Sequence, residues 1–131
     1  DIIHCQGWMA AVVPIYIKLA YNNEPTFSNT KIVTSLFKEE LKENLGANFK
    51  KSIELRDISD ETLNKYSDEF DFTELGKLAI DYSDAIIEAE ENANNTLLNY
   101  AIDNHKEVLR YSPDDYIKNY KLLYDKILQQ K

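Results

Sequence analysis

The side chains best suited to chemistry stand close together near the start of the chain. His4 and Gln6 end a short apolar run, Asp1–Cys5, and Trp8 follows directly after Gly7. An imidazole and an amide exchange hydrogen bonds with hydroxyl groups, and an indole face packs on an apolar ring surface. These three side chains could therefore contact a sugar, and His4 could contact a phosphate instead. A packed structural histidine and a core tryptophan are the alternatives.

Other reactive side chains fit less well. Cys5 lies in an apolar run without a basic neighbour, so we expect an inert thiol in the core. Glu88 and Glu90 would face the same way on an extended chain, so they could serve as the acid and base of a glycosidase. An acidic chain also produces such pairs by chance.

Metal and phosphate motifs are missing from the sequence. No cysteine or histidine pair has zinc spacing, and the acidic stretch 68–71 lacks the glycine and ligand spacing of an EF-hand. Neither a Walker A nor a GxGxxG pattern can be written around the three isolated glycines. We therefore predict no metal site, no cofactor and no catalytic residue of these kinds.

Composition bounds the class of protein. A net charge of -8 and a pI near 4.7 repel phosphate backbones and anionic lipid, so we expect neither a nucleic acid nor a membrane partner. The single cysteine and the lack of a signal-type apolar segment favour the cytoplasm. The 131 residues suit one α/β domain over 1–131. Because the chain starts at Asp1, directly in a predicted strand, we expect a fragment of a longer protein.

Strand-like and helix-like segments alternate along the chain. The segment 37–82 is charged and has helical spacing, which predicts two or three helices. Alternation of this kind predicts a Rossmann-like three-layer α/β fold, with a mostly parallel sheet of about four strands and flanking helices. The predicted strands are 1–5, 30–36, 84–89 and 107–111. The other predicted helices are 8–21, where Pro14 causes a kink or sits in the first turn, and 96–104. The helical spacing in 37–82 involves Phe37, Leu41 and Leu45, then Phe72, Leu75, Leu78 and Ala79.

The last helix has the clearest start signal. Ser112 can cap it, Pro113 suits the first helical position, and Asp114 and Asp115 favour the positive end of the helix dipole. Its predicted buried face consists of Tyr116, Ile117, Tyr120, Leu123, Tyr124, Ile127 and Leu128.

The first sixteen residues, DIIHCQGWMAAVVPIY, resemble a segment of glycogen and starch synthases that reads roughly DVVHxHDWHTxLxPxY. The resemblance continues through Phe27, Asn29 and Lys31–Val33, and more weakly through Ser83–Ile86. The chain is thus similar to part of the N-terminal domain of a bacterial glycogen or starch synthase. The residues that match the first segment are Asp1, His4, Trp8, Pro14 and Tyr16.

The resemblance implies a retaining glycosyltransferase of the GT-B type, which transfers glucose from ADP-glucose to an α-1,4-glucan in a cleft between two Rossmann-like domains. Gln6, Gly7 and Met9 stand where the family has histidine, aspartate and histidine. Thr34–Phe37 replaces the family's TxHN-like turn.

Three functions stay open at this point. The chain is a piece of an active synthase, or a non-catalytic relative that binds a glucan or pairs with a synthase subunit. As a third alternative, nine tyrosines on an acidic surface predict a protein-interaction face and a homo-oligomer.

Overall fold

Four parallel strands form the centre of the protein, in a computed structural model that describes residues 1–38, 42, 44–55 and 57–130. They lie in the order β1-β2-β3-β4, and the register places His4 beside Val33 and Thr34 beside Ile86. Strands β2 and β3 are buried along almost their whole length, as expected of parallel strands covered on both faces, and their buried polar residues are Thr34, Ser35 and Glu88. The predicted parallel sheet is confirmed. The strands are β1 (Ile2–Gln6), β2 (Lys31–Leu36), β3 (Ala85–Glu88) and β4 (Glu107–Leu109).

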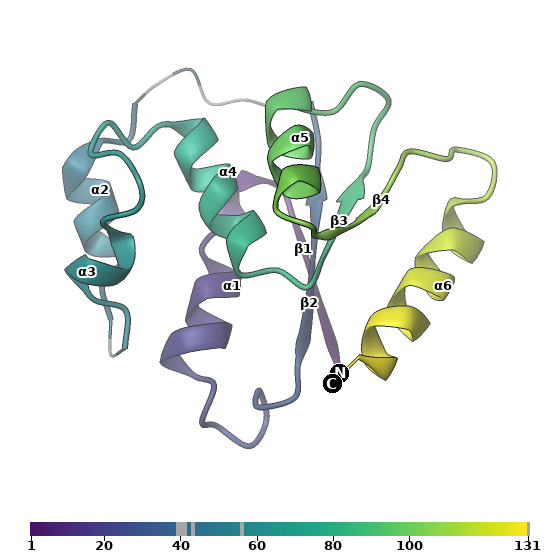
Figure 1. Ribbon diagram of the computed structural model, residues 1–131, viewed down its shortest axis with the longest axis horizontal. Coiled ribbons are helices and arrows are strands. Elements are labelled where there is room, and N and C mark those ends of the chain that lie inside the picture. Colours follow the sequence, from purple (N-terminus) through teal and green to yellow (C-terminus); the bar gives the residue numbers. More distant parts are fainter. Residues whose placement is uncertain (39–41, 43, 56, 131) are drawn as a thin grey trace.

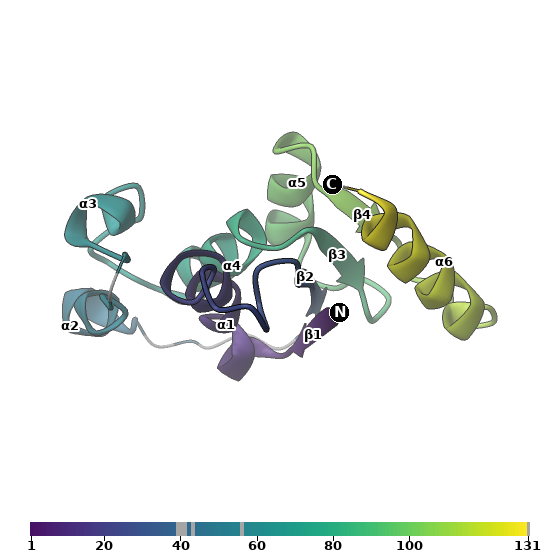
Figure 2. The same cartoon turned by 90° about the horizontal axis from the view of Figure 1, so that it is seen from below.

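Helices cover both faces of this sheet, which makes the fold Rossmann-like. Figures 1 and 2 show α1, α4 and α5 on one face and α6 alone on the other, while α2 and α3 lie beyond α4. The helices on the first face are η1 (Trp8–Ala10), α1 (Val13–Ile15), η2 (Tyr16–Ala20), α4 (Phe72–Asp81) and α5 (Asn95–Asp103). The outer pair is α2 (Gly46–Ser52) and α3 (Asp60–Leu63), and the helix on the second face is α6 (Tyr116–Gln129).

Two helices of the first face pack unusually closely. Asp71 and Asn94 cap the starts of α4 and α5 by accepting hydrogen bonds from backbone amides. Where the helices meet, a Cβ atom added to Gly76 would lie 2.4 Å from Cδ1 of Leu97, a fully buried side chain. Glycine is therefore the residue that lets α5 approach α4.

The segment 8–21 is helical but not one continuous α-helix. A 3-10 turn, a short α-turn and a π-helical turn follow one another as η1, α1 and η2. Pro14 occupies the first turn of α1, one of the two predicted arrangements, where its missing amide hydrogen leaves no helical bond unmade.

The described residues of the segment 37–82 form three helices, within the predicted two or three, but the first helical spacing does not lie in one of them. Phe37 directly follows β2 in irregular structure, and Leu45 only flanks the start of α2. Leu41, the third residue of that spacing, lies outside the described residues. The second spacing, which begins at Phe72, is the buried face of α4.

The predicted start of the last helix is wrong. The helix α6 begins at Tyr116, three residues after Pro113, and Asp115 stands at its N-cap without a capping bond. The reason is a long-range contact: the amide of Tyr111 donates to the carboxylate of Glu88 at 3.0 Å and so holds the chain at the sheet edge. Ser112 accepts a hydrogen bond from the side chain of Asn119 at 2.9 Å instead of capping.

The buried face of α6 is narrower than predicted. Leu123 and Ile127 are buried against Val33, Ala85 and Ile87 of the sheet. Tyr120 and Tyr124 are half-buried, whereas Tyr116, Ile117 and Leu128 are exposed. The sheet below is only four strands wide, so a single row of side chains is enough to cover it.

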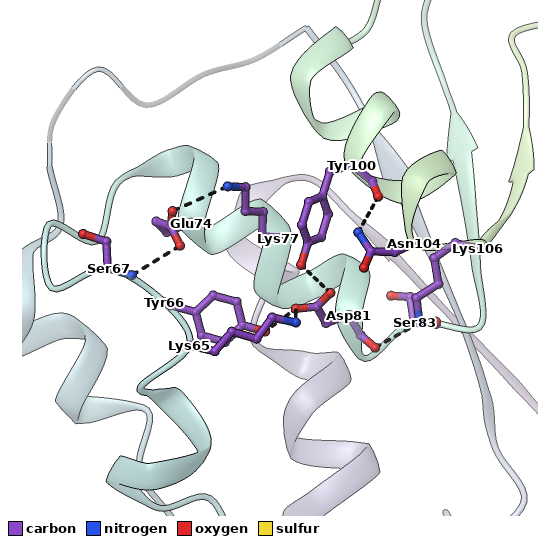
Figure 3. A network of polar contacts seen from close by, with 10 residues as sticks. All are labelled: Lys65, Tyr66, Ser67, Glu74, Lys77, Asp81, Ser83, Tyr100, Asn104 and Lys106. Atoms are coloured by element: carbon purple, nitrogen blue, oxygen red, sulfur yellow. Dashed lines mark hydrogen bonds and ion pairs between the residues drawn. The ribbon is translucent and has the colours of Figure 1, made fainter.

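A polar cluster fixes the amino-terminal edge of the sheet. Asp81, the last residue of α4, accepts hydrogen bonds from Lys65 at 2.7 Å, Tyr66 at 2.5 Å and Tyr100 at 2.7 Å (Figure 3). Lys106, just before β4, donates to the backbone carbonyl of Asp81 at 3.0 Å. The cluster joins the α3–α4 connection, α4, α5 and the start of β4.

Candidate functional site

The carboxyl ends of all four strands meet at one edge of the sheet, because every neighbouring pair is parallel. A pocket of about 350 Å³ opens there, between the strand ends and the first turns of α6. Open α/β sheets bind their ligands at this edge. The pocket is lined by Gln6, Ser35, Phe37, Glu88, Ala89, Arg110, Tyr111, Ser112, Pro113, Tyr116 and Tyr120.

Glu88, the last residue of β3, is the most deeply placed charge of the pocket. Its side chain is 7% exposed, and Oε1 accepts hydrogen bonds from Nε of Arg110 at 3.1 Å and from the amide of Tyr111 at 3.0 Å. This carboxylate therefore holds the segment that leads from β4 over the sheet edge to α6.

The second carboxylate oxygen of Glu88 faces the pocket. Within the described part of the chain, Oε2 makes no hydrogen bond, and no side-chain oxygen or nitrogen there is both buried and unpaired. Oε2 is thus accessible, and the cavity it borders is this pocket. A carboxylate so placed is an acceptor for hydroxyl or amide hydrogens of a ligand.

Two tyrosines of α6 form an aromatic wall. The rings of Tyr116 and Tyr120 meet edge to face, with centroids 5.8 Å apart. Burial raises the pKa of Tyr120, and the nearby Tyr116 raises it further. The hydroxyl therefore keeps its proton at neutral pH and can donate a hydrogen bond. Such rings offer apolar faces for stacking together with a polar tip.

His4 lies under this wall with both ring nitrogens engaged. Nδ1 pairs with the hydroxyl of Tyr124 at 2.6 Å, and Nε2 pairs with Oγ of Ser35 at 2.5 Å. Burial lowers the pKa of His4, which keeps the imidazole neutral near pH 7. The residue joins β1, β2 and α6 immediately below the pocket.

The other two predicted site residues lie on different sides of the strand end. Gln6 is exposed and lines the main pocket. Trp8, on η1, borders a separate cavity of about 30 Å³ beside Gly76 and Leu97, on the face of α4 and α5. The turn between them depends on Gly7, whose φ of 79° and ψ of 166° are open almost only to glycine.

The remaining reactive side chains have structural surroundings. Cys5 is buried, and burial raises the pKa of its thiol. Within residues 1–38, 42, 44–55 and 57–130, no three histidine, cysteine or acidic side chains are grouped to hold a metal ion. No helix in the same ranges is long and apolar enough to cross a membrane.

Reasoning from the sequence missed most of the pocket. Arg110, Tyr111, Tyr116 and Tyr120 come together only because the segment after β4 turns back over the sheet edge. One available signal was position: Glu88 and Arg110 stand at the predicted carboxyl ends of parallel strands, where ligand groups collect.

Comparison with known proteins places this geometry in a family. The chain belongs to the starch synthase catalytic domain family, whose match covers residues 1–110. A 36-residue segment is 44% identical to the glycogen synthase of Clostridium perfringens, and it makes up 28% of this chain and 8% of that relative. The glycogen synthases of Thermotoga maritima and Thermotoga petrophila are 39% identical over 36 residues, which is 28% of this chain and 7% of each relative. No solved structure matches the chain.

The protein is accordingly a glycogen-synthase-like glycosyltransferase domain with a Rossmann-like fold. The match ends at Arg110, so α6 and its two pocket tyrosines lie outside it.

Proposed function

We propose that this domain works in α-glucan synthesis in the cytoplasm, as part of a GT-B glycosyltransferase that transfers glucose from ADP-glucose to an α-1,4-glucan. The observation that carries the proposal is the family match over residues 1–110, together with an open pocket at the carboxyl ends of the matched strands. The relatives named glycogen synthase support the same activity.

In this proposal each of the three predicted site residues has a different role. Gln6 contacts sugar hydroxyls through its exposed amide, and Trp8 lines the neighbouring small cavity and contacts the ligand from there. His4 acts as a positioning residue, because its two hydrogen bonds hold Ser35 and Tyr124 under the pocket. The acidic chain favours an uncharged sugar unit in this pocket, from the glucan or from ADP-glucose, and the diphosphate of the donor then binds to groups beyond these residues.

A non-catalytic relative is the second candidate, and one observation favours it. Met9 stands exposed on η1, where the family has a histidine, and Gln6 and Gly7 replace two further polar residues of the family pattern. Such a domain would keep the glucan site and lose transfer, or it would pair with a synthase subunit or with a second copy through its exposed tyrosines.

An amide NMR titration tests the proposal. The chain is titrated with ADP-glucose and, separately, with a maltooligosaccharide, while the signals of residues 4–9 and the Trp8 indole are followed. Saturable shifts in this segment with both ligands are expected for a transferase domain. Shifts with the maltooligosaccharide alone favour the glucan-binding relative. Unchanged spectra at millimolar ligand contradict both sugar-binding functions and favour a domain that pairs with a synthase subunit or a second copy.

A further inference from the structure

The pocket contains an arrangement that the family match does not supply. Glu88, whose side chain is 7% exposed, lines it and keeps one carboxylate oxygen without a partner among the described residues, and an aromatic wall from α6, beyond the matched residues, lines it too. We propose that this pocket is a subsite for one uncharged sugar unit, in which Glu88 accepts hydrogen bonds from ring hydroxyls while Tyr116 and Tyr120 pack against the ring. The inference rests on the proposed function only for the identity of the sugar, α-1,4-linked glucose.

Charge decides the class of ligand. Glu88 is 7% exposed, so a phosphate or carboxylate ligand would meet a negative charge from which water is largely excluded. Arg110 offsets part of that charge, but its side chain is 64% exposed and only its Nε is paired with the carboxylate. A metal ion is equally disfavoured, because no three ligating side chains are grouped within the described ranges. A neutral ligand with several hydroxyl donors fits best.

Hydrogen-bond capacity points the same way. A carboxylate has about four acceptor sites, and Oε1 of Glu88 already accepts two bonds from the protein. Bonds to a charged acceptor are shorter and stronger than bonds between neutral groups, so Oε2 is the strongest vacant acceptor of the pocket. Two neighbouring hydroxyls of a sugar ring can donate to one such carboxylate.

The aromatic wall is placed to receive the apolar side of a sugar. Tyr116 is 51% exposed, its ring meets that of Tyr120 edge to face, and both residues line the pocket. Tyr120 is in turn held from below by His4, whose ring centroid lies 6.0 Å away. A wall fixed in this way loses little side-chain freedom when a ligand binds.

The test is calorimetric titration of the chain with maltotriose, using matched variants. Glu88→Gln keeps the shape of the side chain and removes its charge, and we expect binding to weaken on the order of tenfold. Glu90→Gln makes the same change two residues away, outside the pocket lining, and should bind like the unchanged protein.

A second pair of variants guards against loss of fold, since Glu88 also anchors Arg110 and Tyr111. Tyr116→Ala removes one exposed ring and should weaken maltotriose binding roughly fivefold. Ile117→Ala is its control, because Ile117 is 71% exposed on the same helix turn and does not line the pocket. Equal affinities for Glu88→Gln and Glu90→Gln, and for Tyr116→Ala and Ile117→Ala, would overturn the subsite.

Two further outcomes separate this inference from the proposed function. If maltotriose shifts the NMR signals of residues 6–9 but all four variants bind it equally, the glucan function stands and the Glu88 subsite is wrong. If maltotriose shifts no signal while ADP shifts those of Glu88 and Tyr116, the pocket is a nucleotide site and the inference is overturned.

Discussion

The polar cluster around Asp81 allows the sharpest prediction of stability. Replacing Asp81 with alanine removes the acceptor shared by Lys65, Tyr66 and Tyr100, and Asp81 is itself only 12% exposed. The buried Tyr66 hydroxyl loses its partner, which costs about 1–3 kcal/mol. The half-buried Tyr100 adds up to about 1 kcal/mol, and the Lys65 pair adds less than about 1 kcal/mol because Lys65 is 60% exposed.

These contributions predict a loss of about 1–5 kcal/mol in the free energy of unfolding. Urea denaturation followed by circular dichroism measures it, and Asp103→Ala, an exposed aspartate at the end of α5, serves as the control. The control should change stability by less than about 0.5 kcal/mol. A loss below about 1 kcal/mol for Asp81→Ala would refute the reasoning that this carboxylate holds the α3–α4 connection, α4 and α5 together.

Three further predictions follow from packing and charge. For His4→Gln, we expect the stability of the protein to depend less on pH, because the lowered pKa of His4 makes the folded protein lose stability as pH falls below the ordinary value of 6.5. The urea midpoints measured at about pH 7.5 and about pH 5.5 should therefore differ less for the variant than for the unchanged protein. An equal difference in the two proteins argues against this role of His4. Gly76→Ala should lower the unfolding free energy by about 1–2 kcal/mol, because the added methyl group overlaps with Leu97. In a protein that already carries Leu97→Ala, the same change should be neutral or stabilising. A loss of equal size in both proteins speaks against the overlap. Leu123→Ala should lower the unfolding free energy by about 2–5 kcal/mol, because Leu123 is buried against the sheet. Its control, Leu122→Ala, changes an exposed neighbour and should lower it by less than about 0.5 kcal/mol. Similar losses for the two variants would show that α6 does not pack on the sheet as described.

The central sheet was predictable because its signals are local. The runs that became β2 and β3 are nearly continuous in apolar or β-branched residues, as strands covered on both faces require. The start of α5 likewise followed from a short helical pattern after an asparagine that caps it.

The start of α6 and most of the pocket depend on contacts between distant residues. Ser112 and Pro113 carry a good local start signal, but the bond from Tyr111 to Glu88, 23 positions away, decides where the helix begins. The same bond brings Arg110 and the tyrosines to the sheet edge. No periodicity or spacing in the sequence encodes it, so only Gln6 of the three predicted site residues lies in the main pocket.

The most direct measurement is a crystal structure of the chain with maltotriose bound. The account predicts sugar density at the carboxyl edge of the sheet, with one ring against Tyr116 and Tyr120 and a hydroxyl within hydrogen-bond distance of Glu88. Density at the opposite edge, near Asp81, or a carboxyl-edge pocket left empty at saturating maltotriose, would contradict it.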